Sequence, residues 1–152
     1  MGALSSGGVT VLNRNVIAGL GLTQSDIEAA ISREERELER RESEYRDGRA
    51  PLAVNGRAAI LVDDGLATGS SMRVAASTLR QKSPAQIVVS VPVASPSTCS
   101  EFQSEVDRVV CAVTPEPFWA VGQWYRDFSQ TTDEEVRECL RRAADFSARK
   151  AA

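Results

Sequence analysis

Three short apolar runs set the strongest limit on how this chain of 152 residues can fold. They span residues 58–62, 87–93 and 108–113, and each has the length of one strand. The nearly unbroken apolar character of the first two is typical of strands that are buried on both faces of a sheet. Helical signals lie between them, and strands that alternate with helices form parallel βαβ units. The pattern therefore predicts an α/β fold with an open, mostly parallel, Rossmann-like sheet and flanking helices.

The helices are predicted from their start signals and from the spacing of their apolar residues. Residues 71–81 have apolar side chains at helical spacing, with Met72 among those expected to face inward. Ser95, followed by a proline, predicts the start of a helix that runs to about residue 106. A Thr-x-x-Glu pattern at residues 132–135 is a capping box for a last helix. Residues 23–45 predict a long, charge-rich and mostly solvated helix.

Length and charge place the chain in a broad class. Its length fits one domain with a single core, which we assign to residues 1–146, and residues 147–152 are expected to be a tail or the start of a linker. The formal net charge is −3 and no basic run occurs, so binding to nucleic acid is not expected. No stretch has the length and apolar character of a membrane span, and no signal peptide is visible. We therefore expect a cytoplasmic protein without a membrane partner.

Cysteine and histidine usage narrows the chemistry. Cys99, Cys111 and Cys139 are widely spaced and form no C-x-x-C pair. We expect them to be small buried apolar side chains rather than a disulfide framework or a zinc site. Histidine is absent, which excludes Ser-His-Asp, Cys-His and H-E-x-x-H chemistry. Any reaction must use carboxylates, hydroxyls, backbone amides, arginines or a bound metal.

Two adjacent carboxylates follow the first apolar run, at the position where ligands bind in open α/β sheets. Asp63 and Asp64 stand at the carboxyl end of the predicted strand. Because side chains alternate along a strand, one carboxylate can face a ligand while the other turns toward a second layer of contacts. Such a pair suits a cis-diol, and it also suits the support of Mg²⁺ through water.

The turn after the carboxylates has the composition of a phosphate-binding loop. Residues 65–70 carry little side-chain bulk, and the hydroxyls of Thr68, Ser70 and Ser71 can converge with backbone N–H groups on one phosphate. The helix that begins near Ser71 adds its positive dipole end. A diol beside a terminal phosphate is a ribose 5-phosphate. A Walker A loop is excluded because no lysine follows Gly69.

Residues 59–71 resemble the 5-phosphoribosyl-1-pyrophosphate (PRPP) motif of type I phosphoribosyltransferases. The shared pattern is a run of apolar residues, Asp-Asp, two variable positions, Thr-Gly and further hydroxyl residues. The resemblance implies that Asp63 and Asp64 are catalytic and hold the ribose hydroxyls. It also implies that the phosphoribosyl group is bound by Gly65, Ala67, Thr68, Gly69, Ser70 and Ser71.

The similarity extends over about residues 2–136. Residues 2–8 resemble the second core strand and hairpin of these proteins. Residues 118–122 resemble the base-binding segment of hypoxanthine-guanine phosphoribosyltransferases, which implies that Phe118 or Trp119 faces the base and that the backbone near Val121 reads its edge. The alternative is that these aromatic residues only cover the end of the sheet.

The chain departs from the family pattern at its start, where the first core strand and the pyrophosphate loop are missing. In the family that strand lies between the second strand and the motif strand. Its loss would open a gap of two strand spacings of about 4.8 Å each. The flanking strands could pair directly, a second copy could exchange a strand, or a longer chain could supply the missing piece. We expect one of the last two, so a homo-oligomer or part of a longer chain.

The resemblance implies transfer of phosphoribose from PRPP to a nitrogenous, nucleobase-like acceptor, with release of pyrophosphate. Mg²⁺ is the implied cofactor, held through the substrate and water rather than directly by the protein. The missing pyrophosphate loop favours two alternatives: a non-catalytic regulatory module that binds PRPP or a nucleotide, or a truncated fragment of a longer enzyme. Arg46 and Arg49 lie where the family places its mobile catalytic loop, and they either grip a departing pyrophosphate or belong to a solvated helix end.

Overall fold

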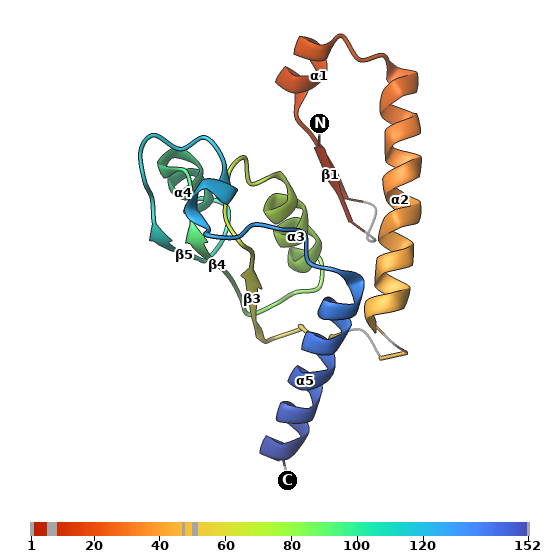
Figure 1. Cartoon of the computed structure of the whole chain (residues 1–152), viewed down its shortest axis with the longest axis vertical. Helices are drawn as coiled ribbons and strands as arrows, with labels where there is room; N and C mark the ends of the chain where they lie inside the picture. Colours follow the sequence, from red (N-terminus) through yellow and green to blue (C-terminus); the bar gives the residue numbers. More distant parts are fainter. Residues whose placement is uncertain (1, 6–8, 47, 50–51, 152) are drawn as a thin grey trace.

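The computed structural model describes residues 2–5, 9–46, 48–49 and 52–151. It confirms the predicted α/β class, with a parallel sheet and flanking helices (Figure 1). In chain order the elements are β1 (Gly2–Leu4), β2 (Thr10–Leu12), α1 (Arg14–Leu20), α2 (Gln24–Arg46), β3 (Ala58–Val62), α3 (Ser70–Arg80), β4 (Gln86–Val93), α4 (Pro96–Phe102), β5 (Arg108–Val113), the 3-10 helix η1 (Val121–Trp124) and α5 (Asp133–Ala151).

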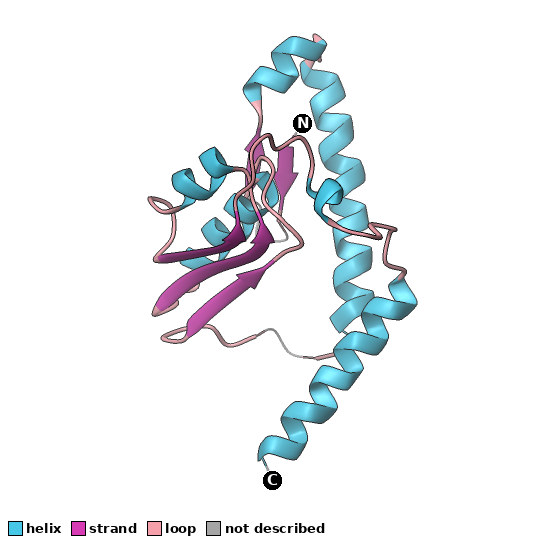
Figure 2. Ribbon diagram, turned by 60° about the vertical axis from the view of Figure 1, so that its left-hand side comes forward, coloured by secondary structure: helices cyan, strands magenta, loops and turns pink. Residues whose placement is uncertain are grey.

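The central sheet has the order β3-β4-β5, and both of its strand pairs are parallel. The register places Ile87 of β4 beside Ala59 of β3, and Val89 of β4 beside Val109 of β5. Ile87 and Val89 are completely buried, together with Phe102 of α4. The core therefore lies between β4 and the two helices α3 and α4, which cover one face of the sheet (Figure 2).

The prediction that the strands are buried on both faces is wrong for β3. Ile60 and Val62 point to the face opposite the core and are 65% and 74% exposed. The physical reason is the sheet's coverage, because α3 and α4 pack against one face only. An apolar run alone cannot distinguish a strand that is covered on both sides from one that leaves apolar side chains in solvent.

The N-terminal segment forms the predicted hairpin, since β1 and β2 pair as antiparallel strands. Ser6, Gly7 and Gly8 lie outside the described residues. The hairpin packs against α3 and α2, and Thr78 of α3 donates a 2.8 Å hydrogen bond to Ser5 (Figure 1). Among the described residues β3 pairs with β4 only, so the direct pairing of the hairpin with the motif strand does not occur.

The long charge-rich helix is confirmed as α2, and its first turn is capped by Thr23, whose N–H and hydroxyl both donate to Asp26. A short helix, α1, precedes it and is capped at its C-terminal end by Gly21, which has a φ of +60°. Ion pairs of Arg40 with Asp133 and of Arg137 with Glu44 join α2 to α5.

The last helix begins as predicted, because the N–H and hydroxyl of Thr132 donate to Glu135 and the Glu135 N–H donates to the Thr132 hydroxyl. The backbone of residues 147–151 continues α5, whereas the proposed domain boundary after residue 146 stays a prediction. None of the helices in the described part of the chain combines the length and the apolar character needed to cross a bilayer.

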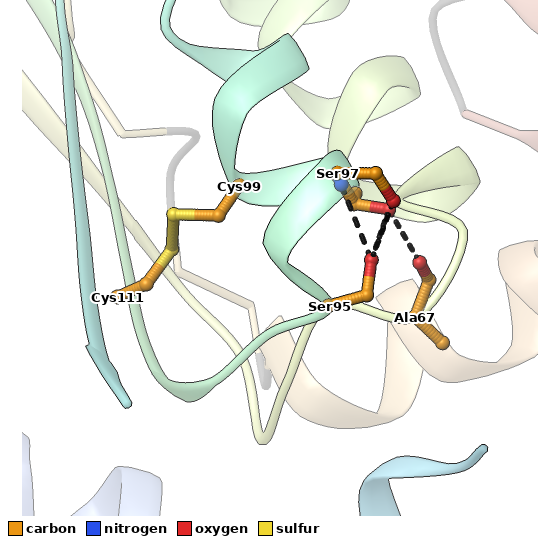
Figure 3. Close-up of a disulfide and its surroundings, with 6 residues drawn as sticks. Ala67, Ser95, Ser97, Cys99 and Cys111 are labelled. Carbon is orange, nitrogen blue, oxygen red and sulfur yellow. Dashed lines mark hydrogen bonds between the residues drawn. A yellow bond between two sulfur atoms is a disulfide. The ribbon is translucent and has the colours of Figure 1, made fainter. Parts of the chain in front are cut away.

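The prediction about the cysteines is wrong. Cys99 of α4 and Cys111 of β5 form a disulfide, with their Cα atoms 6.7 Å apart (Figure 3). Cys139 is free and exposed rather than buried. The reason lies in the β4-α4-β5 crossover, which folds residues 12 positions apart against each other without leaving a recognisable spacing pattern in the sequence.

Candidate functional site

The two carboxylates lie side by side in the chain at the carboxyl end of β3, and both are exposed. The Asp64 N–H donates to the Asp63 carboxylate at 3.0 Å. Desolvation by the surrounding protein raises the pKa of Asp63, and the Asp64 N–H opposes this shift only in part. The hydroxyl of Tyr125 donates to the Asp64 carbonyl at 2.7 Å. This bond holds the backbone at the point where the carboxylate pair leads into the turn.

The turn that follows is held through its carbonyl groups. Leu66 joins the end of the sheet: its N–H donates to the Val93 carbonyl at 3.0 Å, and its carbonyl accepts from the Ser95 N–H at 2.9 Å. The Ala67 carbonyl accepts from the hydroxyl of Thr98 at 2.6 Å (Figure 3). The backbone of the turn is therefore attached to β4 and to the first turn of α4.

Arg73 of α3 supplies a third attachment, because its guanidinium donates to the Thr68 carbonyl at 2.6 Å. Three successive carbonyl groups, those of Leu66, Ala67 and Thr68, are thus engaged by the protein. In a planar trans peptide the N–H of the next residue points the opposite way. The N–H groups of residues 67–69 therefore point away from their carbonyl anchors.

These N–H groups continue into the start of α3. Among the described residues, no acceptor is bonded to the N–H groups of residues 67–71. Successive free N–H groups at a helix N-terminus form a concave, positively polarised site for an anion. We call the backbone of residues 65–71 the phosphate cradle, after the ligand that is proposed for it below.

Gly69 is required by the shape of the phosphate cradle. Its φ is +69°, and a Cβ at this position would lie 2.4 Å from Cε2 of Phe102 and 3.2 Å from Cγ2 of Thr98. Phe102 is completely buried, so its ring cannot turn out into solvent without leaving the core. The sequence pattern Thr-Gly therefore corresponds to a position where only glycine fits.

The hydroxyl residues of the predicted site do not all lie together. The hydroxyls of Thr68 and Ser70 are 3.3 Å apart, and both side chains line a shallow cavity shared with Arg14 and Arg73. Ser71 instead lines a separate cavity between the N-terminal hairpin and α2. Its hydroxyl is therefore not grouped with the other two, although its N–H belongs to the phosphate cradle.

The aromatic segment after β5 is only partly brought to the site. Val121 lies against the turn, because a Cβ at Gly65 would be 2.7 Å and 2.8 Å from its two methyl groups. Phe118 is half-buried, whereas Trp119 is 77% exposed. Val121 thus lies against Gly65, the residue that follows the two carboxylates, and the Trp119 ring has a surface free for stacking.

Two further predictions concern a metal ion and the arginines at the C-terminal end of α2. Among the described residues, no three Asp, Glu or Cys side chains gather closely enough to hold a metal ion. Asp63 and Asp64 remain as groups that could accept from water bound to Mg²⁺. Arg49 donates to the carbonyls of Arg46 and Tyr45, so it caps the C-terminal end of α2, as in the helix-end alternative.

Four residues that shape the site were not assigned to it from the sequence: Tyr125, Ser95, Thr98 and Arg73. Ser95 and Thr98 had an indirect signal, because the Ser-Pro start of α4 places both in its first turn. Tyr125 and Arg73 had none, since Asp64 lies 61 residues from Tyr125 and the carboxylates that orient the Arg73 guanidinium lie 28 and 32 residues from it.

Comparisons with known proteins identify the family of the chain. A family model described as "Phosphoribosyl transferase domain" matches residues 3–128. Two curated Mycobacterium tuberculosis proteins, "Putative phosphoribosyl transferase MT0597" from strain CDC 1551 / Oshkosh and "Putative phosphoribosyl transferase Rv0571c" from strain H37Rv, are each 40% identical over 147 residues. These matches cover 96% of this chain and 33% of each relative, so the chain spans about a third of the length of these relatives.

A solved structure, that of TT1426 from Thermus thermophilus, is similar with a TM-score of 0.70 and 40% sequence identity. The match covers 91% of this chain and 65% of TT1426.

Proposed function

Because this chain belongs to the phosphoribosyl transferase domain family, we propose that it binds PRPP and transfers the phosphoribosyl group to a nitrogenous base with release of pyrophosphate. The observation that carries this proposal is the phosphate cradle. Its five successive N–H groups at residues 67–71 have no acceptor among the described residues, and they follow directly after two exposed carboxylates. A phosphorylated sugar has the complementary groups: a diol for the carboxylates and a phosphate for the N–H groups.

The 5-phosphate would bind the N–H groups of the phosphate cradle and the hydroxyls of Thr68 and Ser70. This contact is remote from C1, where the reaction takes place, so it contributes binding energy that positions the sugar. Asp63 and Asp64 would accept hydrogen bonds from the ribose hydroxyls. Their negative charge would also stabilise the positive charge that develops on the ribose as pyrophosphate leaves.

Mg²⁺ would neutralise the pyrophosphate leaving group as a Lewis acid when it is bound. The ion would be held by the substrate and by water, and the exposed carboxylates Asp63 and Asp64 could accept from that water. The acceptor base would stack on Phe118 or Trp119, and the backbone near Val121 would read its edge. The contact of Val121 with Gly65 supports this placement because it brings the aromatic segment to the sugar end of the site.

The assignment is tested by replacing Asp63 and Asp64 together with asparagine and titrating PRPP by calorimetry in the presence and absence of Mg²⁺. We expect the double variant to lose most of its affinity, whereas Asp145→Asn, an exposed position on α5, should bind as the unchanged protein does. Equal affinity of the double variant and the unchanged protein would defeat the assignment.

A second candidate function is a non-catalytic module that binds PRPP or a nucleotide. It is favoured by the outer edge of β3, which pairs with no strand among the described residues. An assay of pyrophosphate release over a panel of bases separates the two. Turnover with any base removes the module, and binding without turnover supports it. A folded, monodisperse monomer would contradict the third alternative, a fragment that a partner chain keeps folded.

A further inference from the structure

We propose that Arg73 is a positioning residue of the phosphate cradle, which orients the peptide between Thr68 and Gly69 so that the Gly69 N–H faces the phosphate. The proposal rests on the proposed function, since it concerns how the same site is kept ready for an anion. It is carried by a group of contacts that converge on the Arg73 guanidinium from α3, the turn and α4.

The guanidinium is engaged on every nitrogen. One terminal nitrogen donates to the Thr68 carbonyl at 2.6 Å, and the other donates to Glu101 at 2.7 Å. The Nε atom donates to both oxygens of Glu105 at 2.9 Å and 3.0 Å. The side chain is only 25% exposed. With both ends of the planar group fixed by carboxylates, the position of the nitrogen that holds the Thr68 carbonyl is also fixed.

Phe102 completes this arrangement. The central carbon of the Arg73 guanidinium lies 4.9 Å from the centroid of the Phe102 ring. The same ring also packs against Gly69, because a Cβ at Gly69 would lie 2.4 Å from Cε2 of Phe102. The ring and the guanidinium together leave the peptide between Thr68 and Gly69 one orientation, with its carbonyl toward Arg73 and its N–H toward the open side.

The role is geometric rather than electrostatic. Two carboxylates, Glu101 and Glu105, surround the single positive charge of Arg73, so the group as a whole does not attract an anion. A lysine would keep the charge but could not hold three partners in the fixed directions of a guanidinium. Replacement by lysine therefore separates the two roles.

The experiment compares the full chain with Arg73→Met and Arg73→Lys, and uses Arg80→Met as the matched control. Arg80 lies on the same helix and pairs with Asp107, but it makes no contact with the phosphate cradle. Inorganic phosphate and PRPP are titrated by calorimetry, and melting temperatures are recorded. We expect both Arg73 variants to bind PRPP about ten- to hundredfold more weakly, because the phosphate then loses its hydrogen bond from the Gly69 N–H. This is the size expected for the loss of one hydrogen bond to a charged group. Arg80→Met should lose stability without losing affinity.

Wild-type affinity in Arg73→Lys would overturn the proposal, because charge alone would then suffice. Wild-type affinity in Arg73→Met would overturn it as well. A ligand-free readout keeps the test separate from the proposed function: NMR couplings report the orientation of the Gly69 N–H in the free protein. If the unchanged protein binds no PRPP, the proposed function fails, whereas an unchanged Gly69 orientation in Arg73→Met overturns the positioning role whatever the ligand result.

The disulfide carries a second, independent inference: we infer that the Cys99–Cys111 bond makes the phosphate cradle sensitive to the thiol redox state. Cys99 directly follows Thr98, which holds the Ala67 carbonyl, in the same helix turn as Ser95 (Figure 3). The disulfide ties this turn of α4 to β5. Without it, α4 loses its side-chain cross-link to β5 while it still carries anchors of the phosphate cradle.

The chemical step is thiol–disulfide exchange with a small thiol. A thiolate attacks one sulfur and releases the other cysteine as a thiolate, which takes up a proton. A second small thiol then attacks the mixed disulfide, which leaves Cys99 and Cys111 both as thiols and the two small thiols joined as a disulfide. A small-molecule disulfide reverses the same steps.

The test is a phosphate and PRPP titration of oxidised and reduced protein, with Cys139→Ser as the control because Cys139 is free and exposed. We expect reduction to weaken binding about fivefold or more, a typical size for coupling between sites. Cys99→Ser/Cys111→Ser should behave as the reduced protein under both conditions, and Cys139→Ser should keep the response. Equal affinity of the oxidised and the reduced protein would overturn the inference. It would also be overturned if the NMR shifts of the 67–71 amides in the ligand-free protein were the same before and after reduction.

Discussion

A methyl group at position 69 would have no space in this structure. In Gly69→Ala the new Cβ would lie 2.4 Å from Cε2 of Phe102, and the residue would have to keep a φ of +69°. The left-handed conformation costs an L-residue about 1–2 kcal/mol. Overpacking against a buried ring adds about 1–3 kcal/mol. We therefore expect the free energy of unfolding to fall by about 2–5 kcal/mol.

Two other glycines separate these contributions. Gly56 has a φ of +66° with no atom within 4 Å of its added Cβ, so Gly56→Ala should show the conformational cost alone, about 1–2 kcal/mol. Gly19 lies in α1, also with open space around it and without a positive φ. Gly19→Ala should stabilise the protein by about 0.5–1 kcal/mol, because alanine favours a helix. The difference between Gly69→Ala and Gly56→Ala measures the clash.

The measurement is urea unfolding followed by circular dichroism, together with thermal melting. For a chain of this size each 1 kcal/mol corresponds to about 2–4 °C in melting temperature. Phe102→Leu in the Gly69→Ala background should recover part of the loss, because it removes the ring atoms that the methyl group meets. If Gly69→Ala costs no more than Gly56→Ala, the close approach of Phe102 to the phosphate cradle is refuted.

Four further predictions concern charge, covalent linkage and hydrogen bonding. The raised pKa of Asp63 means that its contribution to stability is complete below the unfolded pKa and is lost as the pH rises through the folded pKa. Asp63→Asn should therefore have a higher melting temperature than the unchanged protein at pH 7, and this difference should disappear in acid. The pKa of Asp107 is lowered, mainly because the Ile87 N–H of β4 donates to its carboxylate. Asp107→Asn should therefore destabilise the protein at pH 7, and the loss of stability should vanish as the pH falls through the folded pKa. Melting curves from pH 3 to 7 test both aspartate predictions. Cys99→Ser/Cys111→Ser should cost about 3 kcal/mol for a 12-residue loop, and a thiol titration of the oxidised protein that finds three free thiols would contradict the bond. Tyr125→Phe should cost about 1 kcal/mol and weaken PRPP binding, since the Asp64 carbonyl loses its donor; unchanged melting and binding would contradict that role.

Much of the fold was predictable because its signals are local. The three strands, the capped starts of α2, α4 and α5, and the order of strand, carboxylates, turn and helix all depend on residues within one turn or strand of one another. The Thr68–Gly69 pair could likewise be identified as part of the turn, since a left-handed glycine and a hydroxyl neighbour leave a local pattern.

Burial and the contacts between elements depended on the tertiary structure. Whether Ile60 and Val62 are covered is decided by which face α3 and α4 occupy, and the sequence of β3 carries no record of that choice. The disulfide follows from the crossover that stacks α4 on β5. The same holds for Arg73, whose carboxylate partners lie 28 and 32 residues away.

By itself, therefore, the sequence determined the α/β alternation, the family resemblance and the residues of the acidic strand end and its turn. Only the tertiary structure decided which way the peptides of that turn face, because their orientation depends on donors from α3 and from the capped start of α4 that hold its carbonyls. A local pattern can place a glycine or a hydroxyl in a loop. The direction of an N–H group is set by what binds the carbonyl on the other side of the same planar peptide.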